Sequence, residues 1–394
     1  MSKFNALVLA GVSAVLAASA SHAGGWAAQD LGVLPGGTWS FAISMNEEGQ
    51  IAGNGDARGQ AGYYRPVLWS NGQISELPLL PGDVNSNVHG MNDSGDVVGW
   101  SGDLKIVCPA NSINIFVNKS CVNGSFPKAV IWHNGTVERL LPLIAPTDTL
   151  SGANAFGVND DGEVTLVTGR VTSTCNTVAC ATATRRVTVI NEDGVATELP
   201  YLPTGVYSVP HAILEDGTVV GYSGINGSNP LVVGPKHAAL WAGGTVTDLG
   251  VFSGGTNSEA WWMNGKGQIV GYSTGKDAAG VAYLHAALWQ NGVLTDLGTL
   301  AGGTVSNAFG INNEGQIVGY SNTVAGGSTH AVLWQRGQII DLGTLPGGDA
   351  ALATAINDRG QIAGGSNGIN TDLSKFNEHA VLWTAPGDDA GESE

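Results

Sequence analysis

Histidine and aspartate recur together at one fixed spacing, and this pairing is the first candidate for chemistry. An imidazole beside a carboxylate can exchange protons during catalysis. Three histidines each stand 11 residues before an aspartate: His237 before Asp248, His285 before Asp296 and His330 before Asp341. Arg65 and Glu76 keep the same spacing and opposite charges earlier in the chain. Because a repeated spacing of this kind places both side chains on one face of a hairpin, we predict structural pairs rather than catalytic ones.

Two motifs of established catalytic or metal chemistry are absent from the sequence. It contains no His-Glu-x-x-His pair and no sialidase-type SxDxGxTW box. The NDSG and NDDG sequences at 92–95 and 159–162 lack the alternating ligands of an EF-hand, so we expect ordinary turns there. We therefore assign no catalytic residue, metal or cofactor, and keep an enzyme that acts on a polymer as an alternative.

Aromatic residues give a better candidate for a ligand site. Trp100, Tyr222, Tyr272 and Tyr320 stand in VGWS or VGYS sequences, just before stretches of variable length. Repeated aromatic residues most often pack inside a protein. The alternative is a partial ring of surfaces on which sugars or peptides stack.

The elements that carry these residues form seven copies of one unit. A turn sequence such as MNEEGQIAG (45–53) or INNEGQIVG (311–319) recurs seven times, and a motif such as HAVLW follows it in six copies. The unit at 306–343 shows four strands: A (SNAFGI), B (QIVGYS), C (HAVLW) and D (IIDLG). In three other units, Asn-Gly between strands C and D (71–72, 134–135 and 291–292) favours a type I′ hairpin turn.

Seven sequential units of four short strands are typical of an all-β, seven-bladed β-propeller. Strand A fits the crowded centre, because its positions equivalent to Ala308 and Gly310 are mostly small. A β-helix or a two-sheet sandwich is the alternative. The last unit lacks strand D, whereas WAAQDLG (26–32) is a strand D without a unit. We therefore predict that the N-terminal strand completes the last blade and that Asp30 pairs with His379.

Composition narrows the partners and the location. A net charge of −17 with only 16 lysines and arginines argues against nucleic acid and anionic membranes as partners. Residues 1–23 resemble a signal peptide, with Lys3, an apolar run at 6–18 and a small-residue site ending at Ala23. The run is too short for the alternative of a membrane anchor. We predict a secreted or periplasmic monomer without a membrane span, with the propeller over 24–385 and an acidic, disordered tail over 386–394.

All four cysteines lie in the predicted exported part, where disulfides persist. The simplest pairing is local, Cys108 with Cys121 and Cys175 with Cys180, each within one B-to-C loop. A metal site is the alternative, but neither pair has CxxC spacing and no histidine is close in sequence.

The sequences HAALW, HAVLW, TDLGTLAGG and INNEGQIVG resemble those of the HAF repeat family of extracellular bacterial repeat proteins. The resemblance covers nearly all of the predicted mature chain, with Ala or Val here in place of the Phe that follows His-Ala. It implies an exported repeat protein and names no activity. Variable loops on a rigid scaffold commonly carry function. We therefore predict a scaffold that binds an unknown protein or carbohydrate on its B-to-C loop face, at Trp100, Tyr222, Tyr272 and Tyr320. The alternatives are a structural surface component and a polymer-acting enzyme.

Overall fold

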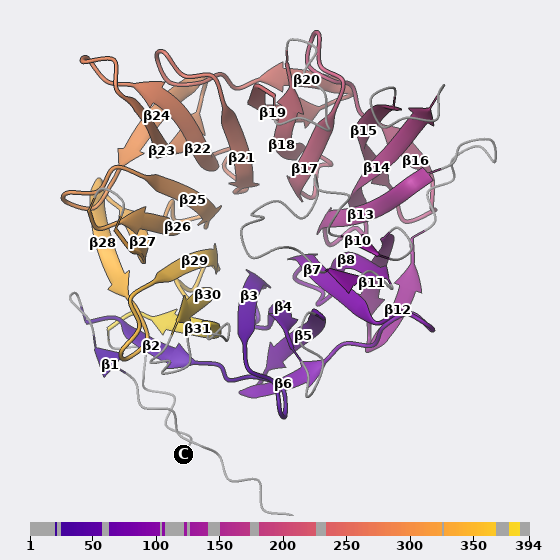
Figure 1. The fold of residues 1–394 in the computed structure, drawn as a ribbon, viewed down its shortest axis with the longest axis horizontal. Helices are drawn as coiled ribbons and strands as arrows, with labels where there is room; N and C mark the ends of the chain where they lie inside the picture. The colour runs from indigo at the N-terminus through magenta and orange to yellow at the C-terminus, as the bar shows by residue number, and fades with distance from the viewer. Residues whose placement is uncertain are drawn as a thin grey trace, which may run out of the picture.

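The computed structural model describes residues 20–21, 25–56, 63–102, 105–106, 122–123, 127–140, 150–173, 181–225, 234–324, 327–367 and 378–386. These residues form a closed ring of seven antiparallel sheets around a central axis, and none of them lies in a helix (Figure 1). The predicted seven-bladed β-propeller is therefore confirmed. Among the described residues, no helix is long and apolar enough to cross a membrane.

Each blade is a meander in which strand A is innermost (Figure 1). Blades 1 to 3 comprise β3 (Ser40–Met45), β4 (Ile51–Gly55), β5 (Arg65–Ser70) and β6 (Gln73–Glu76); β7 (Asn85–Met91), β8 (Val97–Gly102), β11 (Lys128–His133) and β12 (Thr136–Arg139); β13 (Leu150–Val158), β14 (Val164–Ser173), β15 (Ala181–Ile190) and β16 (Ala196–Glu198). Blades 4 and 5 comprise β17 (Ser208–Ile213), β18 (Val219–Gly224), β19 (Lys236–Ala242) and β20 (Thr245–Asp248); β21 (Ser258–Met263), β22 (Ile269–Lys276), β23 (Ala282–Gln290) and β24 (Val293–Gly298). Blades 6 and 7 comprise β25 (Ser306–Ile311), β26 (Ile317–Asn322), β27 (Thr329–Gln335) and β28 (Gln338–Gly343); β29 (Ala351–Ile356), β30 (Ile362–Asn367), β31 (Glu378–Thr384) and β2 (Ala27–Asp30). A separate pair, β9 (Lys105–Ile106) and β10 (Val122–Asn123), lies between β8 and β11 in the chain.

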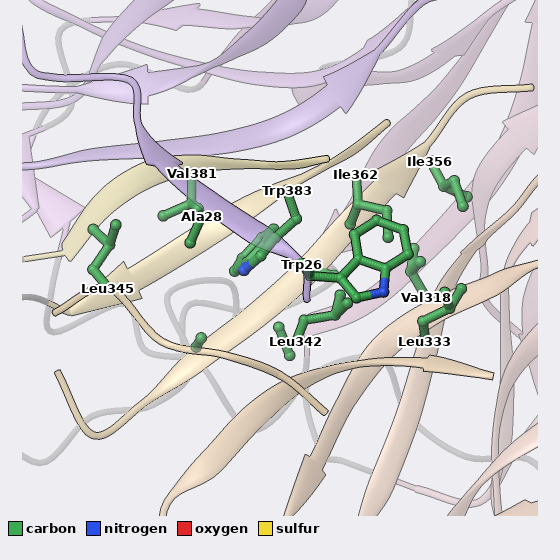
Figure 2. Packing of buried hydrophobic residues seen from close by; sticks show 13 residues of the cluster. Trp26, Ala28, Val318, Leu333, Leu342, Leu345, Ile356, Ile362, Val381 and Trp383 are labelled. Carbon is green, nitrogen blue, oxygen red and sulfur yellow. The ribbon is translucent and has the colours of Figure 1, made fainter. Parts of the chain in front are cut away.

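The N-terminal strand closes the ring as predicted. β2 pairs antiparallel with β31, from Ala27 opposite Thr384 to Asp30 opposite Val381. The carboxylate of Asp30 accepts a hydrogen bond from Nδ1 of His379 at 2.7 Å. Trp26 is buried in the core shared by blades 6 and 7, beside Val318 and Leu333 (Figure 2). A fifth strand, β1 (Ala20–Ser21), pairs with β2 and falls within the predicted signal peptide.

The strand ends are joined by the turns that the sequence predicts. Asn71 and Gly72 have φ values of 51° and 70°, and the other Asn-Gly turns repeat this left-handed pair. In the A-to-B turns, an asparagine bonds its own turn and also donates to the next blade: the side chain of Asn92 donates to the carbonyl of Asn159 at 2.9 Å. Asn264 makes the same bond to Asn312 at 2.9 Å. The ordinary turns are confirmed, and they also tie the blades together.

The repeated tryptophans and charge pairs are structural. Trp69, Trp132 and Trp241 are buried, and each indole N–H donates to a backbone carbonyl on the preceding crossing. The predicted pairs are all present: His237 with Asp248 at 2.8 Å, His285 with Asp296 at 2.9 Å, His330 with Asp341 at 2.8 Å, and Arg65 with Glu76 at 3.4 Å. They link strands C and D at the outside of the blades, away from the axis. The four cysteines lie outside the described residues.

Candidate functional site

A β-bulge at the same place in every innermost strand positions one side chain toward the axis. The pairing of strands A and B skips one residue in each blade, at Ile43, His89, Phe156, His211, Trp261, Phe309 and Thr354. A bulge leaves the extra residue outside the ladder and redirects its side chain. All seven of these axial residues are partly exposed, although the residue before each of them is buried.

Small residues beside the bulge allow the blades to approach closely. A Cβ added to Gly90 would lie 2.5 Å from the carbonyl oxygen of Phe156 on the next blade, which is closer than atoms can pack. This confirms the prediction that strand A carries small residues because it is crowded. The axial side chains are therefore held by a tightly packed backbone.

Five successive blades place a ring-shaped side chain at the axis. The ring centroids lie 4.7 Å apart for His89 and Phe156, 6.0 Å for Phe156 and His211, 4.0 Å for His211 and Trp261, and 5.3 Å for Trp261 and Phe309. We call these five residues of blades 2 to 6 the axial arc. Blades 7 and 1 carry Thr354 and Ile43 instead, and the hydroxyl of Thr354 donates to the carbonyl of Ala42 at 3.1 Å.

A buried carboxylate joins the axial arc to one ammonium and one phenol. One oxygen of Glu259 lies 2.8 Å from Nε2 of His211, and the other is paired with the ammonium of Lys236. The hydroxyl of Tyr272 donates to Glu259 at 3.1 Å. The Lys236 ammonium also lies 4.0 Å from the ring centroid of Tyr222, within the range of a cation–π contact.

These contacts fix the charge state of the cluster near neutral pH. Burial alone would raise the pKa of Glu259, but Lys236 and His211 lower that pKa to about 2, so the carboxylate is ionised. Burial and the neighbouring Glu259 carboxylate raise the pKa of Tyr272, which stays protonated. Burial, assisted by His211, lowers the pKa of His89 to about 4, so its imidazole is neutral. The Glu259 carboxylate and the Lys236 ammonium therefore neutralise each other, close to the neutral imidazole of His89 and the protonated phenol of Tyr272.

The structure brings three of the four predicted aromatic residues into this cluster. Tyr222, Tyr272 and Tyr320 lie directly opposite the residue that stands two before the axial residue, in blades 4, 5 and 6. The ring of Tyr320 is 5.8 Å from that of Phe309, and the ring of Tyr222 is 5.8 Å from that of His211. All three tyrosines keep part of their surface exposed.

Trp100 occupies the equivalent place in blade 2, but its surroundings differ. It lies opposite Asn87 and is only 5% exposed. Its side chain therefore has little surface to offer to a ligand. Blade 3 separates it from the blades that carry the three tyrosines.

Sequence reasoning missed the axial arc and the Glu259 cluster. One signal was available: Glu259 stands where three other blades have asparagine, at Asn87, Asn154 and Asn307. The pairing with Lys236 and His211 depends on two blades being side by side, which spacing along one chain does not reveal. Within the described residues, no group of three or more His, Cys, Asp or Glu side chains is arranged to hold a metal ion.

Comparison with known proteins shows the fold. Neither a protein-family model nor a curated protein sequence matches the chain. Among solved structures, it is similar to the acylaminoacyl peptidase of Pyrococcus horikoshii, with 9% identity and a TM-score of 0.52 over 88% of this chain and 51% of that one. It is also similar to a puromycin-hydrolysing peptidase of Mycobacterium tuberculosis, with 12% identity and a TM-score of 0.53 over 90% of this chain and 55% of that one. The chain spans about half the length of these two proteins, and the likeness is that of a propeller.

Proposed function

We propose that the chain is an exported binding scaffold of the HAF repeat type, whose ligand docks at the inner end of its B-to-C loop face. The observation that carries this proposal is the meeting of Tyr222, Tyr272 and Tyr320 with the axial arc around a buried ion pair. Partly exposed aromatic rings with a few convergent polar groups are typical of small-ligand sites. The ligand is a carbohydrate or a segment of another protein.

The buried ion pair supports a role beyond folding. Removing two charges from water costs free energy, and apolar residues in their place are often at least as stable. The junction of blades 5 and 6 has Leu284 and Asn307 where the junction of blades 4 and 5 has Lys236 and Glu259. Since that neighbouring junction folds without charges, the ion pair is not required by the architecture.

The two faces of the ring also differ in what they offer. The A-to-B turns are short, and their side chains bond to the next turn: the side-chain amide of Asn313 donates to the carboxylate of Asp358 at 2.8 Å. The B-to-C loops carry the variation in length, from the five residues at 277–281 to the 25 residues at 103–127. Variable loops above a rigid scaffold favour the B-to-C face as the recognition surface.

Binding is tested with the purified mature protein on glycan and peptide arrays, followed by titration of any hit. Tyr222→Ala and Tyr320→Ala should each weaken binding by about fivefold, because aromatic contacts contribute about 1 kcal/mol. Glu314→Ala, in an A-to-B turn, is the matched control and should bind normally. If only A-to-B turn variants weaken binding, the face is wrong. If no array yields a ligand, the alternative of a structural surface component is favoured.

The His211 and Glu259 pair favours one second candidate, an enzyme that acts on a polymer. A carboxylate that holds one imidazole nitrogen leaves the other nitrogen to accept or donate a proton. Turnover of polysaccharide and peptide substrates by the mature protein, abolished by His211→Gln with folding intact, would support it. Absence of turnover across such a panel would leave binding as the function.

A further inference from the structure

Three junctions between neighbouring blades share one arrangement at the axis. In each, the axial residue of one blade has a ring nitrogen. The innermost strand of the next blade has a side-chain oxygen two positions before its own axial residue. The three pairs are His89 with Asn154, His211 with Glu259, and Trp261 with Asn307. The strands place the members of each pair equivalently, so differences between the pairs arise from the side chains.

Only the middle pair is closed. Nε2 of His211 and the Glu259 carboxylate are 2.8 Å apart. In the described part of the chain, the ring nitrogens His89 Nε2 and Trp261 Nε1 and the amide oxygens of Asn154 and Asn307 are buried without a hydrogen-bond partner. An asparagine side chain is one methylene shorter than that of glutamate, which accounts for the open pairs. A buried polar atom left without a partner costs about 1–3 kcal/mol, so a ligand group that bonded these atoms would recover part of that cost.

The chemistry of the open pairs selects that group. The indole N–H of Trp261 only donates, and the side-chain oxygen of Asn307 only accepts. A hydroxyl both accepts and donates, so it can join the two. A carboxylate offers no hydrogen for an amide oxygen, and an ammonium offers no lone pair for an indole N–H.

The surroundings specify a ring that bears several hydroxyls. The axial arc offers aromatic faces against which the C–H face of a sugar ring packs. The charges of Glu259 and Lys236 are already paired, and the imidazole of His89 is neutral, so the arc favours a neutral ligand. We propose that the two open pairs bind hydroxyls of a neutral sugar whose ring lies against the axial arc. This inference rests on the proposed function and names the ligand class of its site.

Tryptophans elsewhere in the blades provide matched controls. Trp289, Trp334 and Trp383 also have an indole nitrogen without a hydrogen-bond partner in the described chain. They lie in the blade cores rather than at the axis and are buried. Phenylalanine in place of Trp334 should therefore leave sugar binding unchanged, whereas the same change at Trp261 should not.

The test is titration of the mature protein with neutral monosaccharides and disaccharides, including glucose, galactose, mannose, N-acetylglucosamine, maltose and cellobiose, read by calorimetry and tryptophan fluorescence. Glucuronate and glucosamine are the charged comparisons. We expect at least one neutral sugar to bind, and Trp261→Phe and Asn307→Leu each to weaken it by about tenfold, the loss of a hydrogen bond. Asn307→Leu should keep or raise the melting temperature, because its oxygen has no partner in the described chain. Trp334→Phe should bind like the parent.

Three outcomes would overturn the inference. The first is that no neutral sugar binds at concentrations up to about tenfold above a Kd of about 1 mM. The others are that a charged sugar binds better than its neutral counterpart, or that Trp261→Phe and Asn307→Leu bind normally. The experiments also distinguish failure of this sugar site from failure of the proposed binding function. If a peptide binds and loses affinity in Tyr222→Ala and Tyr320→Ala but not in Asn307→Leu, the scaffold function stands and the sugar site does not.

Discussion

Closure of the ring by the N-terminal strand makes Trp26 a sensitive point for stability. Trp26 precedes β2, is 6% exposed and packs in a cluster with Leu342 and Trp383 from blades 6 and 7 (Figure 2). A buried tryptophan removes roughly 200 Å² of surface from water, equivalent to about 5 kcal/mol at 25 cal/mol per Å². Partial collapse of the cavity and residual burial in the unfolded chain reduce this figure. Trp26→Ala should therefore lower the free energy of unfolding by about 3–5 kcal/mol.

Deletion of residues 24–33 should have a larger effect. It removes Trp26, the β2 ladder on β31, the Asp30 contact with His379, and the carbonyl of Leu31 that accepts the indole N–H of Trp69 at 3.0 Å. It also leaves β31 as an open sheet edge, which favours aggregation. A loss of this size equals a large part of the 5–15 kcal/mol that stabilises a typical domain.

Urea unfolding of the mature protein, followed by circular dichroism and tryptophan fluorescence, measures both effects. Val293→Ala is the control, because Val293 begins strand β24 and is 61% exposed, so its truncation should change stability by less than about 0.5 kcal/mol. A deletion variant with the parent's midpoint and slope would refute the closure energetics. A Trp26→Ala variant that matches Val293→Ala would refute the burial argument for that residue alone.

Three further predictions concern covalent links, buried charge and pH. Non-reducing peptide mapping should find two disulfides rather than free thiols or crossed pairs, namely Cys108 with Cys121 and Cys175 with Cys180. Glu259→Ala should destabilise the protein by about 3 kcal/mol in thermal or urea unfolding, because it leaves the partly buried Lys236 ammonium without its carboxylate, whereas the double change Glu259→Asn and Lys236→Leu should recover most of that loss. The hydrogen bond to Asp30 raises the pKa of His379 above its ordinary 6.5, so its stabilisation is complete below pH 6.5 and is lost as pH rises through the raised pKa. The pKa of Asp30 is below its ordinary 3.8 although burial opposes this, because His379 and the Gly32 N–H bond the carboxylate, so its contribution holds above pH 3.8 and is lost as pH falls. Stability at the closure should thus be greatest between these pH values, and a flat profile for the difference between the parent and His379→Gln would contradict it.

Local signals in the sequence were enough to predict the ring. The tight turns depend on neighbouring residues, as in the Asn71 and Gly72 pair, and the strands depend on their own alternation. The closure could be predicted because two incomplete units, at the two ends of the propeller, complement each other. The turn asparagines show the limit of this reasoning. The contact of Asn92 with the carbonyl of Asn159 joins residues 67 apart, and only the ring brings them together.

Only the part of the candidate site that repeats along the chain could be selected from the sequence. Tyr222, Tyr272 and Tyr320 could be selected because they repeat at one place in strand B. The axial arc does not repeat in residue type, since it mixes histidine, phenylalanine and tryptophan at one structural position. A bulge makes that position face the axis, and alternation along strand A does not predict it. The pairing of Glu259 with Lys236 could not be predicted, because it depends on the contact between neighbouring blades and on the burial of the carboxylate.

The axial position differs between the closed seam of the ring and the other blades. At the junction of blades 7 and 1, the axial residue Thr354 bonds the backbone of Ala42, so this position holds the blades together next to the closed seam. From blade 2 to blade 6, the same position carries ring side chains. Nε2 of His211 is paired with Glu259, whereas His89 Nε2 and Trp261 Nε1 have no hydrogen-bond partner among the described residues. Closure and the proposed ligand recognition therefore depend on different residues of the repeated blade. A ligand that spans the axial arc would bridge blades 2 to 6 without touching the seam, so it would stabilise the folded protein yet would not replace the strand that closes it. Because the proposed binding site and the closing strand use different residues, a change at an axial residue tests binding, and a change at Trp26 tests the stability of the closed ring.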